Sequence, residues 1–169
     1  LGDFKRSTDE IFLSDVQVSI NDEIKMGNNI LKSYQSQYTV ITSGNIYNYL
    51  RNILDDLTSR IAKPRGFNYQ IYYVKGKPDN VLTSGGKIFV FEKFYNRFDN
   101  SSEVAAVIAH EIAHNEIGHL TSYVKKQKVA NDFGVFGEIF LELENAFTPP
   151  SFNQKQEVQA DLFGIDLVH

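Results

Sequence analysis

The feature that most constrains this chain is a pair of histidines, His110 and His114, within the segment HEIAHNEIGH. In a helix, residues four apart lie on one face, about 6 Å from one another along the axis, so both imidazoles can reach one metal ion. Glu111 lies beside them, where its carboxylate can accept a proton from a water molecule that the ion activates. The segment therefore predicts a metal centre with its own general base.

The flanking residues favour a helix over residues 101–117. Asn100 and Glu103 fit a capping box at its start, and Gly118 fits its end. Apolar residues recur at helical spacing: Val104, Ala105, Val107, Ile108 and Ile112. The alternative is that both histidines are ordinary polar residues of an amphipathic helix. We disfavour it because shuffled chains of this composition would contain H-E-x-x-H only about once in two hundred cases.

A catalytic zinc site normally has three protein ligands and leaves the fourth position to water. The chain has no cysteine, so the third ligand must be a histidine or a carboxylate. His119 is nine residues beyond His110, half a turn out of phase if the helix continued. We therefore expect His119 to lie behind a ligand or at the surface, although a helix break at Gly118 could redirect it.

A carboxylate ligand is available in residues 155–164, within a helix expected to begin after Pro149 and Pro150. Glu157 and Asp161 are four apart and share a face of that helix. We assign Glu157 to the metal, and Asp161 to a hydrogen bond with the ring N–H of a ligand histidine, which holds the ring in place. The alternative is that both carboxylates are ordinary solvent-exposed residues on the surface of the helix. We expect one zinc ion per chain, bound by His110, His114 and Glu157.

These motifs resemble the HtpX-like and BepA-like zinc metallopeptidases, gluzincins that include the membrane-embedded prenyl-protein proteases. That family couples H-E-x-x-H with a downstream E-x-x-x-D followed by glycine, here Glu157 to Asp161 with Gly164. His119 matches a histidine often found at that place. Residues 80–86 (NVLTSGG) look like a degraded form of the family's N-A-F-x-x-x-G-G, and residues 22–27 (DEIKMG) look like the E-I-x-x-G of its soluble members.

The resemblance runs from about residue 20 to the end and implies an α+β, zincin-like metallopeptidase domain, mainly helical with a small sheet beside the H-E-x-x-H helix. It implies an endopeptidase that hydrolyses protein substrates with a zinc-activated water, Glu111 being the catalytic base. The family often supplies an oxyanion-stabilising histidine beyond the E-x-x-x-D helix, but His169 is too close to Asp161 for that assignment. A role in cell-envelope protein quality control, in the bacterial periplasm or envelope, is expected; the alternative location is the cytoplasm.

A different class of function is a zinc-binding chaperone or assembly factor with little or no proteolysis. Glu111 argues against it, because a purely structural zinc would be expected to have four protein ligands. A zinc hydrolase acting on small substrates is a third interpretation, which the resemblance disfavours.

Composition agrees with one domain over residues 1–169. The chain is 42% hydrophobic with a net charge of −4, and its scattered Lys and Arg form no basic stripe, so nucleic acid is not an expected partner. No segment approaches 18 consecutive apolar residues, so no transmembrane segment is expected. Because the chain begins at Leu1 and ends at His169, we expect a processed or trimmed protein; whether an N-terminal signal or lipid anchor was removed is left open by the sequence.

Helices are expected over residues 19–34 and 43–62, the latter carrying the clearest amphipathic pattern, and strands over 67–74 and 87–91. If residues 87–91 form a sheet edge, a substrate backbone could pair with it. Candidate substrate-binding residues are Asn80, Gly86 and Ile88, with simple turn formation an equal alternative for Asn80.

Residues 121–150 connect the two metal-bearing helices. The simplest interpretation is that one solvated helix face carries Lys125, Lys126 and Lys128. The apolar stretch that follows is then a packed helix. A lid or substrate wall is the functional alternative, because Gly134 and Gly137 would let it move. The opening segment to about Phe12 is polar and expected to be loosely held.

Overall fold

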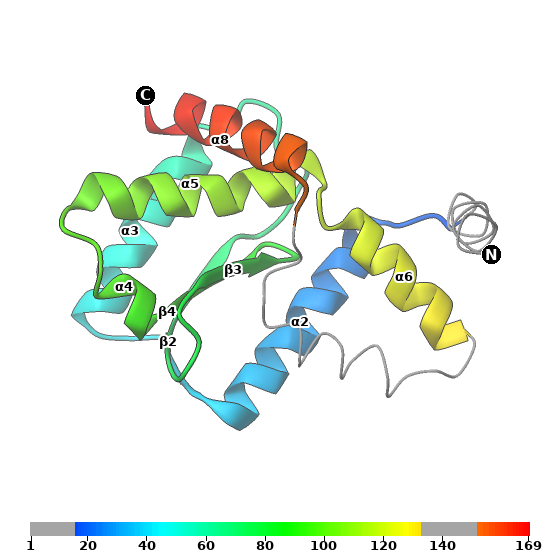
Figure 1. Ribbon diagram of the computed structural model, residues 1–169, viewed down its shortest axis with the longest axis horizontal. Coiled ribbons are helices and arrows are strands. Elements are labelled where there is room, and N and C mark those ends of the chain that lie inside the picture. The colour runs from blue at the N-terminus through cyan, green and yellow to red at the C-terminus, as the bar shows by residue number, and fades with distance from the viewer. Residues whose placement is uncertain (1–15, 133–151) are drawn as a thin grey trace.

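The computed structural model describes residues 16–132 and 152–169, and the expectations for residues 1–12 and 133–150 lie outside these ranges. Figure 1 shows helices arranged around one small sheet. In chain order the elements are α2 (Ile20–Gln37), β1 (Thr39–Ile41), α3 (Asn45–Ser59), β2 (Gln70–Lys75), β3 (Val81–Ser84), β4 (Lys87–Phe91), α4 (Glu92–Tyr95), α5 (Ser101–Ile117), α6 (Thr121–Asp132) and α8 (Gln154–Val168). The described part of the chain is a helix-rich α+β structure.

The sheet has the strand order β1-β2-β4-β3, with β2 and β4 parallel and the other neighbours antiparallel. The expectation that residues 87–91 form a sheet edge is therefore wrong, because β4 pairs on both sides. The edge nearest the histidine helix is β3, a four-residue strand that the sequence analysis did not expect. Gly85 and Gly86 have φ of 56° and 78°, which suits the tight turn that folds β4 back onto β3.

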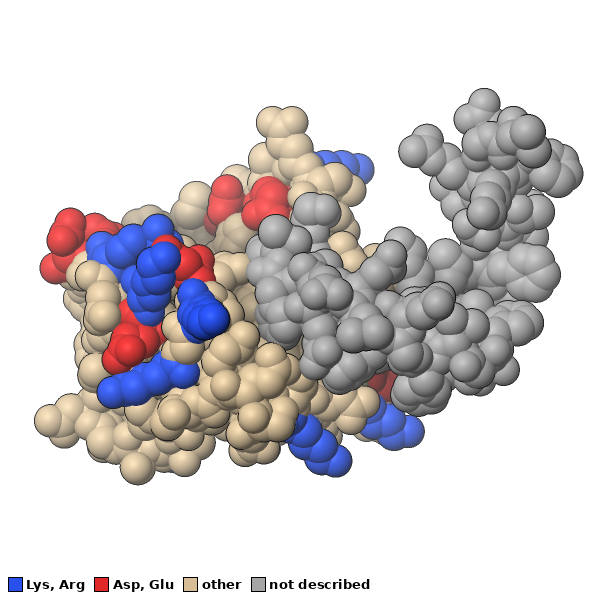
Figure 2. All heavy atoms as spheres, turned by 60° about the horizontal axis from the view of Figure 1, so that its bottom comes forward, with Lys and Arg blue, Asp and Glu red and all other residues tan. Residues whose placement is uncertain are grey.

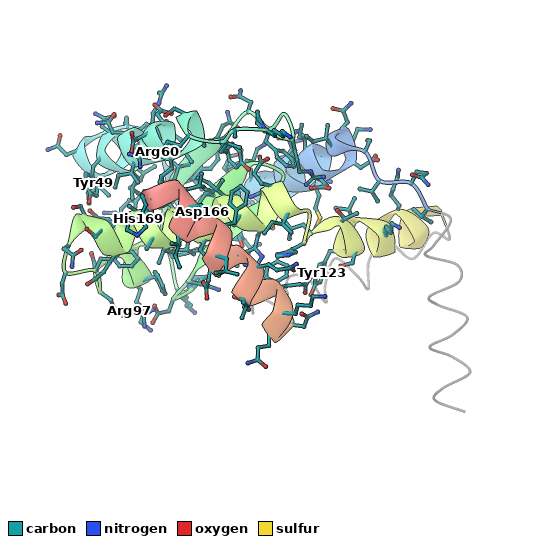
Figure 3. The ribbon with its side chains drawn as sticks, turned by 90° about the horizontal axis from the view of Figure 1, so that it is seen from above. Tyr49, Arg60, Arg97, Tyr123, Asp166 and His169 are labelled. Carbon is teal, nitrogen blue, oxygen red and sulfur yellow. The ribbon has the colours of Figure 1, made fainter. Side chains whose placement is uncertain are left out.

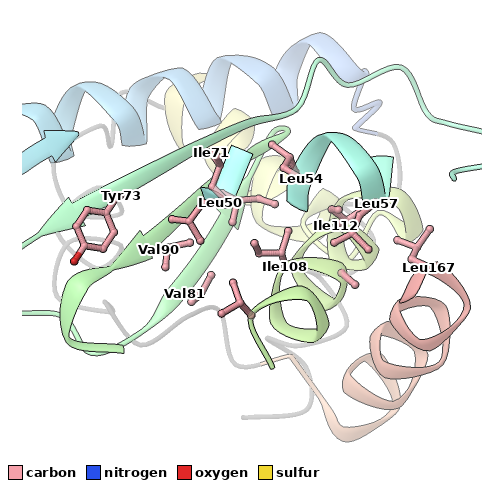
Figure 4. Close-up of a cluster of buried hydrophobic side chains, with 13 residues drawn as sticks. Leu50, Leu54, Leu57, Ile71, Tyr73, Val81, Val90, Ile108, Ile112 and Leu167 are labelled. Carbon is pink, nitrogen blue, oxygen red and sulfur yellow. The ribbon is translucent and has the colours of Figure 1, made fainter. Parts of the chain in front are cut away.

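The main core lies between the sheet and helices α3 and α5 (Figure 4). Leu50, Leu54 and Leu57 of α3 are all buried, as the amphipathic pattern predicts. They meet Ile108 and Ile112 of α5 in one hydrophobic cluster. This packing holds α5 in a fixed place beside the sheet.

Helix α5 has the bounds that its capping residues predict. The Asn100 side chain accepts hydrogen bonds from the backbone N–H groups of Ser102 and Glu103. Gly118 ends the helix in the left-handed conformation, with φ of 80°. Local chemistry at both ends therefore fixes where the two histidines lie along the helix.

Helix α2 covers the other face of the sheet, where Tyr34 packs against Phe89 and Phe91. Its approach to the β3–β4 turn is very close, since a Cβ on Gly27 would lie 2.3 Å from the carbonyl oxygen of Ser84. A Cβ on Gly85 would lie 2.1 Å from the carbonyl oxygen of Glu23. Only glycine fits at these two positions, which gives the glycine of the DEIKMG segment a packing role.

Helix α6 begins three residues after Gly118. Lys128 on this helix is more than a solvated charge, because its ammonium group lies 2.8 Å from Asp22 and 2.8 Å from the carbonyl oxygen of Gln17. These contacts, with the Ser19 cap, hold the pKa of Asp22 well below its ordinary value. Figure 2 shows basic and acidic side chains interspersed on one face of the described residues.

Helix α8 packs along α5, and the two lie side by side in Figures 1 and 3. Ala160, Gly164 and Leu167 form its buried side. A Cβ on Gly164 would lie only 3.3 Å from the backbone nitrogen of His110, so glycine allows the helices to approach at this level. At the far end Arg60 donates a hydrogen bond to the carbonyl oxygen of Leu167. The last helix is thereby brought against the histidine pair.

Candidate metal centre

His110 and His114 lie together on the side of α5 that meets α8. Their Nε2 atoms are 2.9 Å apart, and the ring centroids are 4.6 Å apart. His114 is buried, whereas His110 is partly exposed. The helical spacing has therefore brought two imidazole nitrogens to one point.

Glu157 of α8 reaches the same point. One carboxylate oxygen lies 3.2 Å from Nε2 of His110, and the other lies 3.9 Å from Nε2 of His114. The three side chains form the one group of metal-binding residue types found within the described part of the chain, with ligand atoms within 4.8 Å of one another. A tetrahedral ion with bonds of about 2.0–2.2 Å would separate its ligand atoms by about 3.3 Å, close to the spacing seen here.

The chemistry of this donor set favours a cation. Two nitrogen lone pairs and a carboxylate oxygen that face one another at hydrogen-bond distance repel unless a proton or a cation lies between them. Burial lowers the pKa of His114 to about 3, and the neighbouring imidazoles of His110 and His119 add to the effect. A neutral imidazole is the form that binds a metal ion.

Asp161 lies behind His110. Its carboxylate accepts a hydrogen bond from Nδ1 of His110 over 2.9 Å, which leaves the Nε2 lone pair directed toward Glu157. His119 lies behind His114, with the two Nδ1 atoms 2.9 Å apart. The structure thus brings both residues to the sides of the histidines that face away from the candidate metal position.

Glu111 lines the same cavity as both histidines. The cavity has a volume of about 210 Å³ and is lined by Asn80, Val81, Leu82, Thr83, His110, Glu111, His114, Phe152 and Glu157. Burial raises the pKa of Glu111 to about 8, and the charge of Glu157 adds to the shift. A cation held by the neighbouring ligands opposes this shift, because an opposite charge favours the ionised carboxyl group.

Of the three candidate substrate-binding residues, only Asn80 lines the cavity. Its side-chain oxygen also accepts a hydrogen bond from the backbone of Val81, as a turn-forming asparagine does. Ile88 is fully buried in the main core, and the backbone N–H of Gly86 is bonded to the side chain of Asn115. Ile88 and Gly86 are therefore not available to a substrate, because the strand expected at the edge lies inside the sheet.

Phe152 is a site residue that sequence reasoning missed. Its ring stacks on that of His114, with centroids 3.8 Å apart and planes 17° apart. It precedes Asn153, which caps α8. Stacking between two residues so distant in sequence has no periodic signature, so only the tertiary arrangement shows it.

Asn115 was also missed, although it directly follows a candidate ligand. Its side chain is fully buried, accepts from the backbone N–H of Gly86 and donates to the hydroxyl of Thr83 and the carbonyl oxygen of Glu111. The histidine helix is thereby bonded to strand β3 and to the turn between β3 and β4. This arrangement fixes the sheet edge relative to Glu111.

An ion pair between the partly exposed Arg65 and the buried Glu23 stabilises the same region. Arg65 donates to both carboxylate oxygens of Glu23, at 3.1 and 2.8 Å, and to the carbonyl oxygen of Asn115. Glu23 belongs to the DEIKMG segment and is 1% exposed. The acidic residue of that segment therefore ties α2 to the end of the histidine helix.

Comparison with known families agrees with this geometry. The model of peptidase family M48 matches residues 47–169, which include both histidines, Glu111 and all of α8. The chain belongs to peptidase family M48. This M48 chain is accordingly a metallopeptidase, and its family implies a metal cofactor.

Three curated relatives of the M48 chain are informative. The beta-barrel assembly-enhancing proteases of Yersinia pestis and Escherichia coli are each 24% identical over 170 residues, covering 89% of this chain and 35% of theirs. The mitochondrial metalloendopeptidase OMA1 of Arabidopsis thaliana is 32% identical over 90 residues, covering 49% of this chain and 18% of its own. The chain therefore spans about a third of the length of the first two relatives.

Among the described residues of the M48 chain, no helix combines the length and the apolar character needed to cross a bilayer.

Proposed function

We propose that this chain is a zinc-dependent endopeptidase whose metal is bound by His110, His114 and Glu157. The observation that carries the proposal is the convergence of these three side chains at one point, with Glu111 in the same cavity. Two imidazoles and one carboxylate with a remaining open position are typical of catalytic rather than structural zinc sites.

Zinc, when bound, supplies a Lewis acid and lowers the pKa of a coordinated water from 15.7 toward about 7. The Glu111 carboxylate accepts the proton of the attacking water and then delivers it to the nitrogen of the leaving amine. Asp161 holds the ring of His110 in the orientation that ligation requires. Phe152 covers one face of His114 and limits access of bulk water to that ligand.

The outer edge of β3 is the proposed docking strand for the substrate. Within the described residues β3 pairs only with β4, and Val81, Leu82 and Thr83 line the cavity together with Glu111. An extended peptide that pairs with this edge is held mainly by main-chain hydrogen bonds. The enzyme should therefore accept a broad range of side chains in unfolded or extended protein segments.

The name of two relatives supports a narrower role. Because both are named beta-barrel assembly-enhancing proteases, we infer that this chain acts on cell-envelope proteins during quality control, in the periplasm or envelope.

The test compares Glu111→Gln with the unchanged protein, both loaded with zinc, on an unfolded protein such as casein. We expect zinc content near one ion per chain in both and a loss of cleavage of at least about 100-fold in the variant. Glu103→Gln, at the exposed start of the same helix, is the matched control and should cleave normally. Equal cleavage by Glu111→Gln would overturn the proposal. Suppression of aggregation without cleavage by either protein would support the chaperone interpretation instead.

A further inference from the structure

Helix α8 contacts both candidate histidine ligands from behind. Asp161 contacts His110 directly, as described above. The contact with His114 is indirect, because His119 lies between His114 and α8. The Nε2 atom of His119 lies 3.3 Å from the side-chain oxygen of Gln159 on α8. A chain of contacts therefore runs from Gln159 through His119 to His114.

The positions of the ring protons along this chain depend on one another. For Nε2 of His114 to bind a metal ion, the proton of the neutral ring must be on Nδ1. That Nδ1–H then donates to Nδ1 of His119, which must be unprotonated. The proton of His119 is consequently on Nε2, the atom that faces the oxygen of Gln159.

The opposite arrangement would prevent metal binding by His114. If His119 carried its proton on Nδ1, it would donate to His114, whose own proton would then be on Nε2 at the metal position. His119 would also present an unprotonated Nε2 to the oxygen of Gln159, so that two acceptors would face each other. A hydrogen-bond acceptor at residue 159 thus disfavours the Nδ1-protonated tautomer of His119, which would prevent His114 from binding the metal.

We propose that Gln159 is a positioning residue for the metal centre, acting through His119 to keep the Nε2 lone pair of His114 directed at the metal. The inference rests on the proposed metal site. It makes α8 the source of one ligand, Glu157, and of the groups that orient both histidine ligands. Gln159 is exposed and occupies a variable position between Glu157 and Asp161, so sequence reasoning had no cause to select it.

The role requires a hydrogen-bond acceptor rather than an amide in particular. Gln159→Met keeps the length of the side chain but removes the strong acceptor, whereas Gln159→Glu keeps an acceptor and cannot present a donor. Gln154→Met, an exposed change in the first turn of the same helix, is the matched control. Because residues 154 and 159 are both exposed, all three variants should fold, which circular dichroism checks.

The first measurement is the zinc dissociation constant, determined by competition with a chelator. We expect Gln159→Met to weaken zinc binding by about 10-fold, the lower end of the range for residues that orient metal ligands. Gln159→Glu and Gln154→Met should bind zinc as tightly as the unchanged protein or more tightly. Failure of the unchanged protein to bind zinc would overturn the proposed function, whereas unchanged affinity in Gln159→Met would overturn only the role of Gln159.

The second measurement is the tautomer of His119 in the zinc-loaded protein, from long-range ¹H–¹⁵N correlation spectra of ¹⁵N-labelled histidine rings. We expect one tautomer protonated at Nε2 in the unchanged protein and in Gln159→Glu. Gln159→Met should show a mixture of tautomers or exchange broadening. A pure Nε2–H tautomer of His119 in Gln159→Met would contradict the proposal. Equal loss of zinc affinity in Gln159→Met and Gln159→Glu would also contradict it. Either result would mean that the hydrogen-bond acceptor at residue 159 does not determine the tautomer or the affinity.

Discussion

Asp161 and His110 are 51 positions apart in sequence, yet the Asp161 carboxylate and the Nδ1 atom of His110 lie 2.9 Å from each other. The contact depends on the close approach of α8 to α5 at Gly164. Its consequence is that the Nε2 atom of His110 is directed toward Glu157, 3.2 Å away. In the proposed site, Glu157 would bind the metal and Asp161 would orient His110, so two residues on one turn of α8 would have separate roles.

Asp161→Ala should lower zinc affinity by about 10-fold without abolishing binding, because residues that orient a ligand typically change affinity or activity by about 10- to 100-fold. We expect the lower end because the Asp161 side chain is 64% exposed, so water can replace part of the hydrogen bond. Chelator competition measures the effect. Complete loss of zinc in this variant, with zinc retained in Glu157→Ala, would reverse the roles assigned to Asp161 and Glu157.

Glu157→Ala should remove most of the zinc, since a three-ligand site has no spare protein contact. Elemental analysis after dialysis measures zinc per chain. Asp166→Ala, which removes an exposed carboxylate from the same helix, is the control and should keep its metal. A full zinc content in Glu157→Ala would mean that the third ligand lies elsewhere.

Arg65→Met should destabilise the fold by about 3 kcal/mol, because it leaves the buried Glu23 carboxylate without its charged partner. The control is Arg51→Met, which breaks a pair with Asp55 whose side chains are 60% and 63% exposed. That change should alter stability by less than about 0.5 kcal/mol. Urea unfolding gives both values, and similar losses in the two variants would contradict a special role for the buried pair.

Gly27→Ala should destabilise the fold by about 2 kcal/mol, although alanine normally stabilises a helix relative to glycine. The reason is that the added Cβ would lie 2.3 Å from a backbone oxygen of β3, which cannot rotate away. Asn29→Ala, at an exposed position of the same helix, is the control and should be neutral or slightly stabilising. If Gly27→Ala raised the unfolding midpoint, the close packing of α2 on the hairpin would be disproved.

Local signals in the sequence were sufficient for the helices that carry the site. Asn100 and Gly118 mark the ends of α5 because capping depends on residues within one turn. The amphipathic pattern of α3 likewise identified Leu50 and Leu54 as core residues, because burial repeats with the helical period. The grouping of Glu157 with the histidines was a sequence hypothesis, and the described geometry is compatible with it.

The features that sequence reasoning missed depend on residues far apart in the chain. Strand β3 has only four residues and is followed by two glycines, so the sequence did not indicate a strand there, and residues 87–91 were considered as the sheet edge instead. The hydrogen-bond partners of Asn115 and Arg65 are 29 to 50 residues away in the sequence. The residues next to Asn115 and Arg65 in the sequence therefore give no signal that predicts these contacts. Such residues follow from the tertiary arrangement rather than from periodicity.

The position of Glu157 on a different helix from the two histidines has a mechanical consequence. An ion bound by His110, His114 and Glu157 would cross-link α5 and α8, in addition to the packing at Ala160 and Gly164. The free energy of metal binding would then also stabilise the folded, docked state of α8. Removal of the metal should accelerate amide hydrogen exchange in α8 more than in α3, whose contacts with the core do not involve the site.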